Sequence, residues 1–153
     1  ISFVDIANLT LRNIVEGRLI YQRQKTHGNI NLLLSDEALK IIQKYNKYCQ
    51  QAGYLFPILH NQRHITPMQK SNRIHKICHQ VNTDLRTFAT ELGITAEVTT
   101  YVARHSFATI LKKSGVNIGI ISEALGHQDI KTTQIYLSRF DNEQVDEAMK
   151  NLL

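Results

Sequence analysis

The stretch of sequence that decides the fold is LGHQDIKTTQIY, residues 125–136. Gly126 predicts the end of one helix, because glycine readily adopts the left-handed conformation that closes many helices. Asp129 is placed to cap the next helix, and His127 occupies the turn between the two. Tyr136 lies nine positions after His127, about two turns along the second helix. The stretch therefore predicts two helices joined by a tight turn, with a histidine and a tyrosine at a fixed spacing.

Taken alone, His127 and Tyr136 have two interpretations. A tyrosine hydroxyl, with an ordinary pKa of about 10, is a poor nucleophile near neutral pH. It becomes a useful one where cations and a hydrogen-bonding neighbour lower the free-energy cost of ionising it. The structural alternative makes Tyr136 a core aromatic residue and His127 a turn histidine that caps a helix end.

A second chemically informative segment is YVARHSFAT, residues 101–109, within a helix predicted over residues 100–113. Residues three apart on a helix share a face, so Tyr101 and Arg104 are expected to point at one site. The planar guanidinium group of Arg104 suits two oxygens of one phosphate. The alternative is an amphipathic helix whose Arg104 and His105 only face solvent, and the segment taken alone favours that alternative.

A β-hairpin is predicted upstream of both segments. Residues 19–24 carry β-forming side chains and precede a turn cluster at 26–28, in which Gly28 is expected to supply a positive φ. Residues 11–15 are predicted to add a third strand. Lys25 stands at the end of the second strand, just before the hairpin tip. From there a lysine is able to give a proton to the leaving oxygen of a phosphodiester, although most strand-end lysines are merely solvated. Apolar residues alternate with polar ones in the last strand, at Ile30, Leu32 and Leu34.

The middle of the chain predicts helices. A short helical piece covers residues 5–9, and a longer helix covers residues 35–53. Another helix covers residues 66–93, with Thr66 as its cap and Pro67 in its first turn. The residues expected to face inward are Ile41, Tyr45, Tyr48 and Ala52 in the first long helix, and Ile74, Ile77, Val81, Leu85, Phe88 and Leu92 in the second.

The C-terminal third also predicts helices. The helix over residues 100–113 is expected to turn Ala103, Phe107, Ile110 and Leu111 inward. A short helix follows, with Ile118, Ile121 and Leu125 on its apolar side. Asp141 and Gln144 form a pair like a capping box, which opens a final amphipathic helix. The predicted fold is mostly α with a small antiparallel β-hairpin or three-stranded sheet, an α+β domain.

Composition limits the class of protein. The chain has 153 residues, enough for one domain with a single sizeable core. Its net charge of +5 and pI near 9.3 make nucleic acid a reasonable partner, although many ordinary proteins are this basic. No apolar run approaches the length of a membrane helix. Two cysteines are too few for a disulfide framework, which favours a reducing cytoplasm.

Three of these patterns together resemble the catalytic domain of the tyrosine recombinases, the lambda-integrase-like superfamily. They are the lysine hairpin, the box RHSFAT at residues 104–109, and the box LGH followed by TT and Tyr136. These two boxes stand about twenty residues apart and the tyrosine follows nine residues after the histidine, which makes the signature specific. The resemblance covers essentially all of residues 1–153, which we expect to be a fragment that lacks the family's N-terminal core-binding domain.

The resemblance implies a role for each matching residue. Tyr136 matches the nucleophile that forms a 3′-phosphotyrosine bond with DNA and releases a 5′ hydroxyl. Arg104 matches the arginine that holds the non-bridging oxygens of the scissile phosphate, where charge develops. Lys25 matches the general acid for the leaving oxygen, and His127 matches a residue that hydrogen-bonds the phosphate or supports the tyrosine. Supporting roles are implied for Asp5, in the first box SFVDIANL, and for His105.

The resemblance also implies partners. A tyrosine recombinase cuts and rejoins double-stranded DNA sites without ATP or a metal, because the bond energy is kept in the phosphotyrosine; the chain accordingly has no P-loop. Such proteins assemble on DNA, with a tetrameric synapse as the expected state. The C-terminal helix over residues 141–152 is expected to dock either on a neighbouring protomer or on its own core. The expected setting is the bacterial cytoplasm, in association with the nucleoid and without a membrane.

Two positions depart from the family pattern. Ser2 stands where the family's first arginine is expected, and Tyr101 stands where the second-box histidine is expected. A serine does not replace a guanidinium group in charge or reach, so another cation has to complete the phosphate site. The candidates are a residue upstream of Ile1, or Arg18, Arg23 or Lys131. The same departures resemble the integrases of conjugative transposons in Bacteroidetes, which favours an active enzyme with a modified site.

Three alternatives compete with this interpretation. The first is a catalytically impaired, DNA-binding relative of the recombinases, and the second is an enzyme like the type IB topoisomerases. The third is a zinc protein, because His75 and His79 lie one helical turn apart with Cys78 between them. Cys78 projects away from the face that the two histidines share, so we expect no metal. The same spacing occurs at His60 and His64, and solvent-facing histidines explain both pairs.

Overall fold

The computed structural model describes residues 1–138, apart from the side chains of Tyr136 and Ser138. The final helix that the sequence predicts from Asp141 onward, with its capping pair, lies outside the described residues. The described chain folds as a small three-stranded antiparallel sheet among seven α-helices, which confirms the predicted α+β class. None of the helices in this part of the chain is long and apolar enough to cross a membrane.

The N-terminal part forms one short helix and the sheet. Helix α1 (Phe3–Asn8) begins after Ser2, whose hydroxyl accepts a hydrogen bond from the Asp5 N–H at 3.3 Å. The strands pair in sequence order as β1 (Ile14–Val15), β2 (Arg18–Gln22) and β3 (Asn29–Leu33). The third strand predicted over residues 11–15 is therefore present but short, because residues 11–13 form a turn of 3-10 helix instead.

The loop of the hairpin differs from the prediction in two respects. Strand β2 ends at Gln22, so Lys25 lies in the turn and not on the strand. The positive φ of the loop, 54°, belongs to His27 and not to Gly28. Gly28 is needed for space instead, because a Cβ there would lie 3.2 Å from the carbonyl oxygen of Gly126. The loop is therefore in close contact with a distant part of the chain.

The helix predicted over residues 35–53 is in fact two helices, α2 (Asp36–Lys44) and α3 (Asn46–Ala52). They break at Tyr45, which has a φ of −94° and a ψ of 3°. The Tyr45 ring packs edge-on against Phe56 at 5.5 Å between centroids, and this tertiary contact holds the break. The outer caps of the pair are where the sequence predicts them. The inward position predicted for Ile41 is wrong, since its side chain is 53% exposed.

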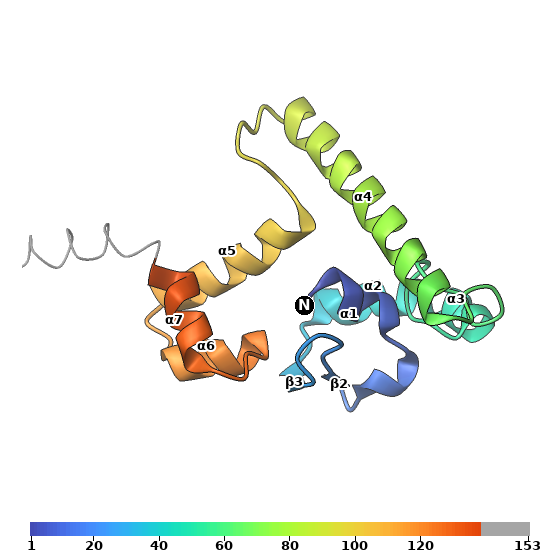
Figure 1. The fold of residues 1–153 in the computed structure, drawn as a ribbon, viewed down its shortest axis with the longest axis horizontal. Coiled ribbons are helices and arrows are strands. Elements are labelled where there is room, and N and C mark those ends of the chain that lie inside the picture. The colour runs from blue at the N-terminus through green and yellow to red at the C-terminus, as the bar shows by residue number, and fades with distance from the viewer. Residues whose placement is uncertain (139–153) are drawn as a thin grey trace, which may run out of the picture.

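Helix α4 (Pro67–Glu91) is 25 residues long and runs away from the sheet (Figure 1). Its predicted start is confirmed, because the Thr66 hydroxyl accepts a hydrogen bond from the Gln69 N–H at 3.2 Å. The predicted continuous apolar face is wrong toward the C-terminal end of the helix. Ile74 is buried, whereas Phe88 is 57% exposed, because the first half of α4 packs on α1 and its end extends beyond the rest of the fold.

The remaining helices are α5 (Thr100–Lys113), α6 (Ile118–Leu125) and α7 (Ile130–Ser138). The bounds predicted for α5 are confirmed, and so is the predicted end of α6 at Gly126. The face of α5 predicted to point inward is confirmed at Leu111, which packs on the core. It is wrong at the other three positions, since Phe107 and Ile110 are 42% and 62% exposed and Ala103 is also exposed. Ala108 is fully buried against α6 and α7 instead. The inner face of α5 thus carries Arg104, the small Ala108 and Leu111, and the alanine lets the helices approach closely.

The hairpin loop joins the two ends of the fold. Figure 1 shows the sheet with α1–α3 on one side and α5–α7 on the other, with α4 leading between them. The Thr26 hydroxyl donates a hydrogen bond to the Gly126 carbonyl at 3.1 Å, and the Gln128 side chain donates to the Thr26 carbonyl. These contacts bring the hairpin loop to the turn between α6 and α7, across about 100 positions of sequence.

Candidate active site

A cavity of about 540 Å³ lies where the hairpin loop, α1, α4, α5 and the turn before α7 meet. The predicted residues Lys25, Arg104 and His127 all line it, although they come from three separate segments. Both variant positions, Ser2 and Tyr101, line it as well. The structure thus brings together in one hollow the side chains that the two sequence boxes and the hairpin contribute.

The C-terminal end of α6 holds two arginines at this cavity. Arg104 donates from Nη2 to the Leu125 carbonyl, and Arg23 donates from Nη1 to the Gly126 carbonyl at 3.0 Å. Carbonyls at the end of a helix carry partial negative charge, which attracts cations. Gly126 has a left-handed φ of 63°, and a Cβ there would collide with Arg23 Cδ and lie 2.9 Å from Ile30 Cδ1. The glycine is therefore required by its conformation and by the space that Arg23 occupies.

Arg23 is held from its other side by an acidic residue. Arg23 is 7% exposed, and its Nε lies 3.5 Å from Oδ2 of Asp5, which is 2% exposed. Asp5 Oδ2 also accepts the hydroxyl proton of Ser2 at 2.6 Å, and Asp5 Oδ1 accepts the Gln24 N–H at 2.9 Å. A buried guanidinium group needs such a partner, because an unpaired buried charge is strongly destabilising. Asp5 therefore lies behind the cavity and fixes Arg23.

The sequence offers Arg18, Arg23 and Lys131 equally as the second cation of the phosphate site, and the structure distinguishes them by position. Arg23 lines the cavity. Arg18 lies on β2, where its Nε donates to the Asn31 side chain at 2.6 Å, and Lys131 is exposed on α7. Neither Arg18 nor Lys131 is among the lining residues. Among these three, Arg23 is the cation positioned to act beside Arg104.

His127 contacts both neighbouring elements through its ring. Its Nε2 lies 3.3 Å from Arg104 Nη2, and its Nδ1 lies 2.8 Å from Oγ1 of Thr133 on α7. Burial lowers the pKa of the His127 imidazole, and the positive charges of Arg104 and Arg23 lower it further. The lowered pKa favours the neutral form of the ring. The predicted cap of α7 is also present, since Asp129 Oδ1 accepts the Lys131 N–H at 2.9 Å.

Tyr101 and His105 lie together at the rim of the cavity. Their rings meet edge to face with 4.3 Å between centroids. Tyr101 lines the cavity and is 60% exposed, whereas His105 is not among the lining residues. His105 therefore contacts the site through Tyr101, and the phenol stands on the same helical face as Arg104, as the spacing of three predicts.

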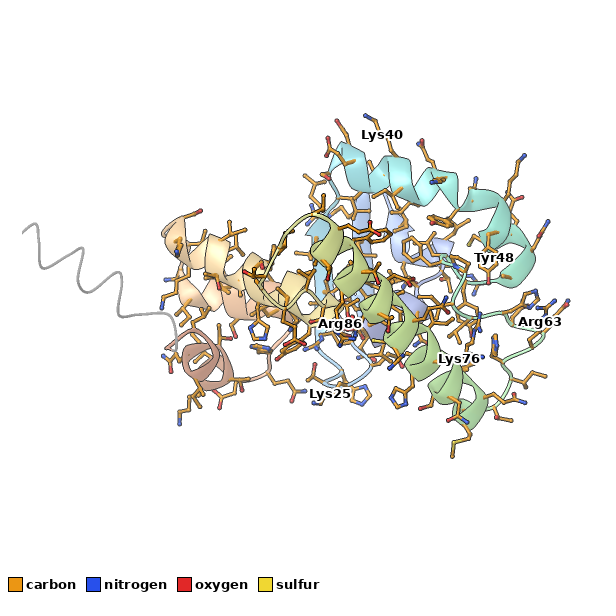
Figure 2. The ribbon with its side chains drawn as sticks, turned by 90° about the horizontal axis from the view of Figure 1, so that it is seen from above. Lys25, Lys40, Tyr48, Arg63, Lys76 and Arg86 are labelled. Atoms are coloured by element: carbon orange, nitrogen blue, oxygen red, sulfur yellow. The ribbon has the colours of Figure 1, made fainter. Side chains whose placement is uncertain are left out.

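Lys25 and Tyr136 complete the predicted set. Lys25 is an exposed residue at the tip of the hairpin loop (Figure 2) and lines the cavity. The backbone of Tyr136 belongs to α7, three positions after Thr133, while its side chain lies outside the described residues. The structure therefore places Tyr136 only through the backbone of α7, which also carries Thr132 and Thr133 beside the cavity.

Comparisons with known proteins identify the family. A sequence profile of the phage integrase family matches residues 3–143. The chain belongs to the phage integrase family. It is 32% identical to tyrosine recombinase XerD of Agrobacterium fabrum over 141 residues, which cover 79% of this chain and 39% of the relative. It is 31% identical to tyrosine recombinase XerA of Saccharolobus solfataricus over 134 residues, which cover 86% of this chain and 39% of the relative. The chain thus spans about two fifths of the length of these relatives.

Solved structures share the fold of this integrase-family chain. A crystal structure of XerA recombinase superposes with a TM-score of 0.67 at 22% identity, covering 97% of this chain and 52% of that one. The Tn1549 transposon integrase, in complex with transposon right end DNA, superposes with a TM-score of 0.64 at 15% identity. The match covers 99% of this chain and 55% of that one. At such identities the likeness establishes the fold.

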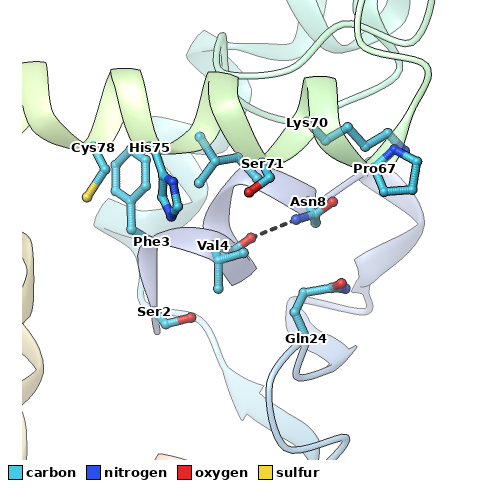
Figure 3. Close-up of a pocket in the computed structure, with 11 residues that line it drawn as sticks. Ser2, Phe3, Val4, Asn8, Gln24, Pro67, Lys70, Ser71, His75 and Cys78 are labelled. Carbon is cyan, nitrogen blue, oxygen red and sulfur yellow. Dashed lines mark hydrogen bonds between the residues drawn. The ribbon is translucent and has the colours of Figure 1, made fainter.

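A second cavity, of about 530 Å³, adjoins the first along α4 (Figure 3). His75 and Cys78 both line it, facing α1, so the prediction that Cys78 projects away from the histidine face is wrong for His75. Across residues 1–138, no group of three or more histidine, cysteine or acidic side chains is arranged to hold a metal ion. In the other histidine pair, His64 Nδ1 accepts the His60 N–H at 2.9 Å. A hydrogen bond to the backbone thus already occupies that ring nitrogen.

Sequence reasoning left two residues of this integrase-family site without a role. Arg23 stood among several candidate cations, and its spacing of two before Lys25 was the available signal. Thr133 belongs to the segment 125–136, but the sequence pattern indicates no function for it. Its burial and its bond to His127 depend on how α7 packs, so no local pattern in the sequence could have indicated them.

Proposed function

We propose that the chain is the catalytic domain of a site-specific DNA recombinase, with Tyr136 as its nucleophile. The observation that carries the proposal is the pairing of Arg23 and Arg104. Two guanidinium groups from distant segments reach one cavity, and the successive carbonyls at the end of α6 hold them. Paired planar cations suit the non-bridging oxygens of a phosphodiester, where negative charge grows in the transition state.

The reaction follows from these groups. The Tyr136 oxygen bonds to phosphorus and its hydroxyl proton leaves to an acceptor in the cavity. The bond from phosphorus to the 5′ oxygen breaks, and Lys25 gives that oxygen a proton. The 5′ hydroxyl of a partner strand then attacks the 3′-phosphotyrosine and releases Tyr136. One phosphate ester is exchanged for another at each step, so the scheme uses neither ATP nor a metal.

Arg23 takes the place of the missing family arginine in this proposal. Ser2 stands at the family position but is too short and uncharged to reach a phosphate as an arginine would. Arg23 lines the same cavity, and Asp5 of the first box holds it at 3.5 Å. The acidic residue of that box thus keeps an arginine partner, although the arginine comes from the hairpin loop.

Double-stranded DNA is the proposed substrate. The Tn1549 integrase structure is a complex with transposon right end DNA, and the present chain shares its fold. The net charge of +5 suits a polyanionic partner. Lys76 and Arg86 lie along α4, the helix that also lines the cavity (Figure 2).

We further propose a tetrameric synapse on DNA, docking of the residue 141–152 helix on a neighbouring protomer or on its own core, and action at the bacterial nucleoid in the cytoplasm.

A suicide DNA substrate tests the proposal. The substrate carries a nick just beyond the cleavage site. Cleavage then releases a short piece of DNA that bears the free 5′ hydroxyl, and this piece diffuses away. Religation is thereby prevented, so the covalent protein–DNA adduct accumulates. The natural full-length protein is expected to give an adduct that survives denaturing electrophoresis, and Tyr136→Phe is expected to give none. Absence of any adduct from a folded, DNA-binding wild-type protein would contradict the proposal.

The departures at Ser2 and Tyr101 keep a second candidate in view, a DNA-binding relative with impaired chemistry. Such a protein would shift a DNA fragment in a gel and leave the suicide substrate uncut. An enzyme like the type IB topoisomerases would form the adduct but would relax one supercoiled duplex rather than exchange strands between two. Measuring adduct formation, relaxation and strand exchange on the same preparation separates the three functions.

A further inference from the structure

Thr26, the residue that follows Lys25 in the hairpin loop, is held on two sides. Its hydroxyl donates a hydrogen bond to the Gly126 carbonyl at 3.1 Å and accepts one from Nη1 of Arg23 at 3.3 Å. Its own carbonyl accepts a hydrogen bond from the Gln128 side chain. The tip of the loop is therefore bound to the turn between α6 and α7 through both the side chain and the backbone of one residue.

The donors and acceptors of this contact balance. The Gly126 carbonyl oxygen has two lone pairs, and it accepts from Thr26 and from Nη1 of Arg23. That nitrogen carries a second N–H, which donates to the Thr26 hydroxyl. The Gln128 amide uses a separate acceptor, the Thr26 carbonyl. No proton and no lone pair is used twice, so these hydrogen bonds form together.

The Lys25 side chain itself has no such anchor. Lys25 is exposed and lines the cavity. Within the part of the chain that the structure describes, its ammonium group makes no hydrogen bond or ion pair. A lysine ammonium stands on a long, flexible stem. The region that it reaches is consequently set by where the backbone of residue 25 is fixed, and Thr26 is the next residue.

The turn that binds the loop also anchors a cation of the phosphate site. Arg104 donates to the Leu125 carbonyl, and Gln128 binds the loop that carries Lys25. Residues 125–128 are therefore a common reference for a group that holds the phosphate and for the group proposed to protonate the leaving oxygen. A shift of the loop relative to this turn would move Lys25 away from the phosphate that Arg104 holds.

We propose that Thr26 and Gln128 are positioning residues that hold the hairpin loop on the turn between α6 and α7 and so place the Lys25 ammonium beside the leaving oxygen. This inference rests on the recombinase function proposed above. As the bond from phosphorus to the 5′ oxygen breaks, a proton passes from Lys25 Nζ to that oxygen and leaves a neutral amine. In the rejoining step, the attacking 5′ hydroxyl returns a proton to that amine. Displacing the proton donor slows such a transfer steeply.

A substrate with sulfur in place of the bridging 5′ oxygen tests the inference. A thiolate leaves without being protonated, because a thiol is a much stronger acid than an alcohol. Lys25→Ala is therefore expected to lose most of its defect on the sulfur substrate. Gln128→Ala, which removes one exposed hydrogen bond, is expected to cut the oxygen substrate about two- to twelvefold more slowly than the wild type. On the sulfur substrate, Gln128→Ala is expected to match the wild type.

Thr26→Val removes the hydroxyl at nearly equal volume. Because that hydroxyl makes two hydrogen bonds, the variant is expected to lose more than Gln128→Ala on the oxygen substrate, and more there than on the sulfur substrate. Thr26→Ser is expected to recover the wild-type rates. Combining Gln128→Ala with Lys25→Ala is expected to slow the oxygen substrate no further than Lys25→Ala alone, since Gln128 acts through Lys25.

Arg18→Gln is the matched control, because it removes an exposed hydrogen bond of the same hairpin at the end away from the loop. It is expected to cut both substrates at nearly the wild-type rate. Urea unfolding checks that each variant is folded. A folded Gln128→Ala that loses equally on both substrates, or loses nothing on the oxygen substrate, overturns the inference.

Hydrogen exchange in the full-length protein without DNA tests the loop contact by itself. The His27 N–H donates to the Arg23 carbonyl at 3.0 Å within the loop, so its exchange rate reports how often the loop opens. Gln128→Ala is expected to speed this exchange about two- to twelvefold, and Arg18→Gln is expected to leave it unchanged. Unchanged exchange at His27 in Gln128→Ala overturns the inference, because other contacts would then hold the loop. If the wild type cuts neither substrate, the recombinase proposal fails, while the exchange result still decides whether Gln128 holds the loop.

Discussion

Arg23 and Arg18 are a matched pair of side chains for testing the phosphate site. Both are arginines near the hairpin, but only Arg23 lines the cavity. Losing a cation that faces the developing charge is expected to slow adduct formation by about 10²- to 10³-fold in Arg23→Gln. Arg18→Gln, which removes a contact with Asn31 on the sheet, is expected to react at nearly the wild-type rate. The measurement is the rate of covalent trapping on a suicide substrate.

Because Arg23 is buried beside Asp5, its variants also need a stability measurement. Arg23→Lys keeps the charge but loses the planar fork, and it is expected to recover only part of the rate. Equal adduct rates for wild type and a folded Arg23→Gln would show that Arg23 is not the second cation.

Gly126 and Gly115 are a matched pair of glycines. Their φ values are 63° and 75°, so alanine is strained at either position, by about 1–2 kcal/mol. A Cβ on Gly126 also meets Arg23 and Ile30, whereas a Cβ on Gly115 meets nothing within 4 Å. Gly126→Ala is therefore expected to lower the free energy of unfolding more than Gly115→Ala, as measured by urea denaturation. Equal losses would mean that the Arg23 contact is not tight.

His127 links stability to pH. Burial, with the charges of Arg104 and Arg23, lowers its pKa below the ordinary value of 6.5, so the folded protein takes up this proton less readily than the unfolded chain. Its contribution to stability is present above about pH 6.5 and is lost as the pH falls through the lowered pKa. The free energy of unfolding is expected to fall less between about pH 7 and pH 5 in His127→Gln than in the wild type.

His64 provides the control for that experiment. Its pKa is also lowered, first by burial and then by the charge of Arg73, but it lies in the loop before α4 and outside the cavity. His64→Gln is measured separately, so that its own part of the pH dependence is subtracted. A His127→Gln profile that coincides with the wild type would refute the coupling of His127 to the two arginines.

Along α5, the buried face makes an equally specific prediction. Ala108 is fully buried against α6 and α7, whereas Ala103 is exposed on the same helix. Ala108→Leu forces extra volume into a packed contact and is expected to lower the free energy of unfolding by about 1–3 kcal/mol. Ala103→Leu is expected to change it little. Thermal or urea unfolding of the two variants measures the difference, and a reversed order would place α5 with its other face inward.

Helix bounds were predictable where the signals are local. Thr66 with Pro67 starts α4 and Gly126 ends α6, because caps depend on side chains within one turn of the helix end. Most of the inner face of α5 was not predictable from apolar periodicity, because Arg104 and Ala108 occupy it and the large apolar residues Phe107 and Ile110 are exposed. The break at Tyr45 depends on Phe56, a contact that no pattern within the helix reveals.

For the domain as a whole, the site was predictable in part. Lys25, Arg104 and His127 stand in recognisable patterns, and all three line one cavity. The placement of Arg23 and of Thr133 depends on packing instead. Arg23 reaches the site only because the hairpin loop docks on the end of α6, about 100 positions later in the chain. Which cation replaces a missing one is therefore a property of the assembled fold.

The central claim is that Tyr136 is the residue joined to DNA, and mapping the covalent bond tests it most directly. The adduct trapped on the full-length protein is digested with protease and nuclease, and mass spectrometry locates the tyrosine that carries the 3′ nucleotide. We predict that the modified peptide contains Tyr136. A nucleotide on another of the chain's six tyrosines, such as Tyr101 at the rim of the cavity, would contradict the account.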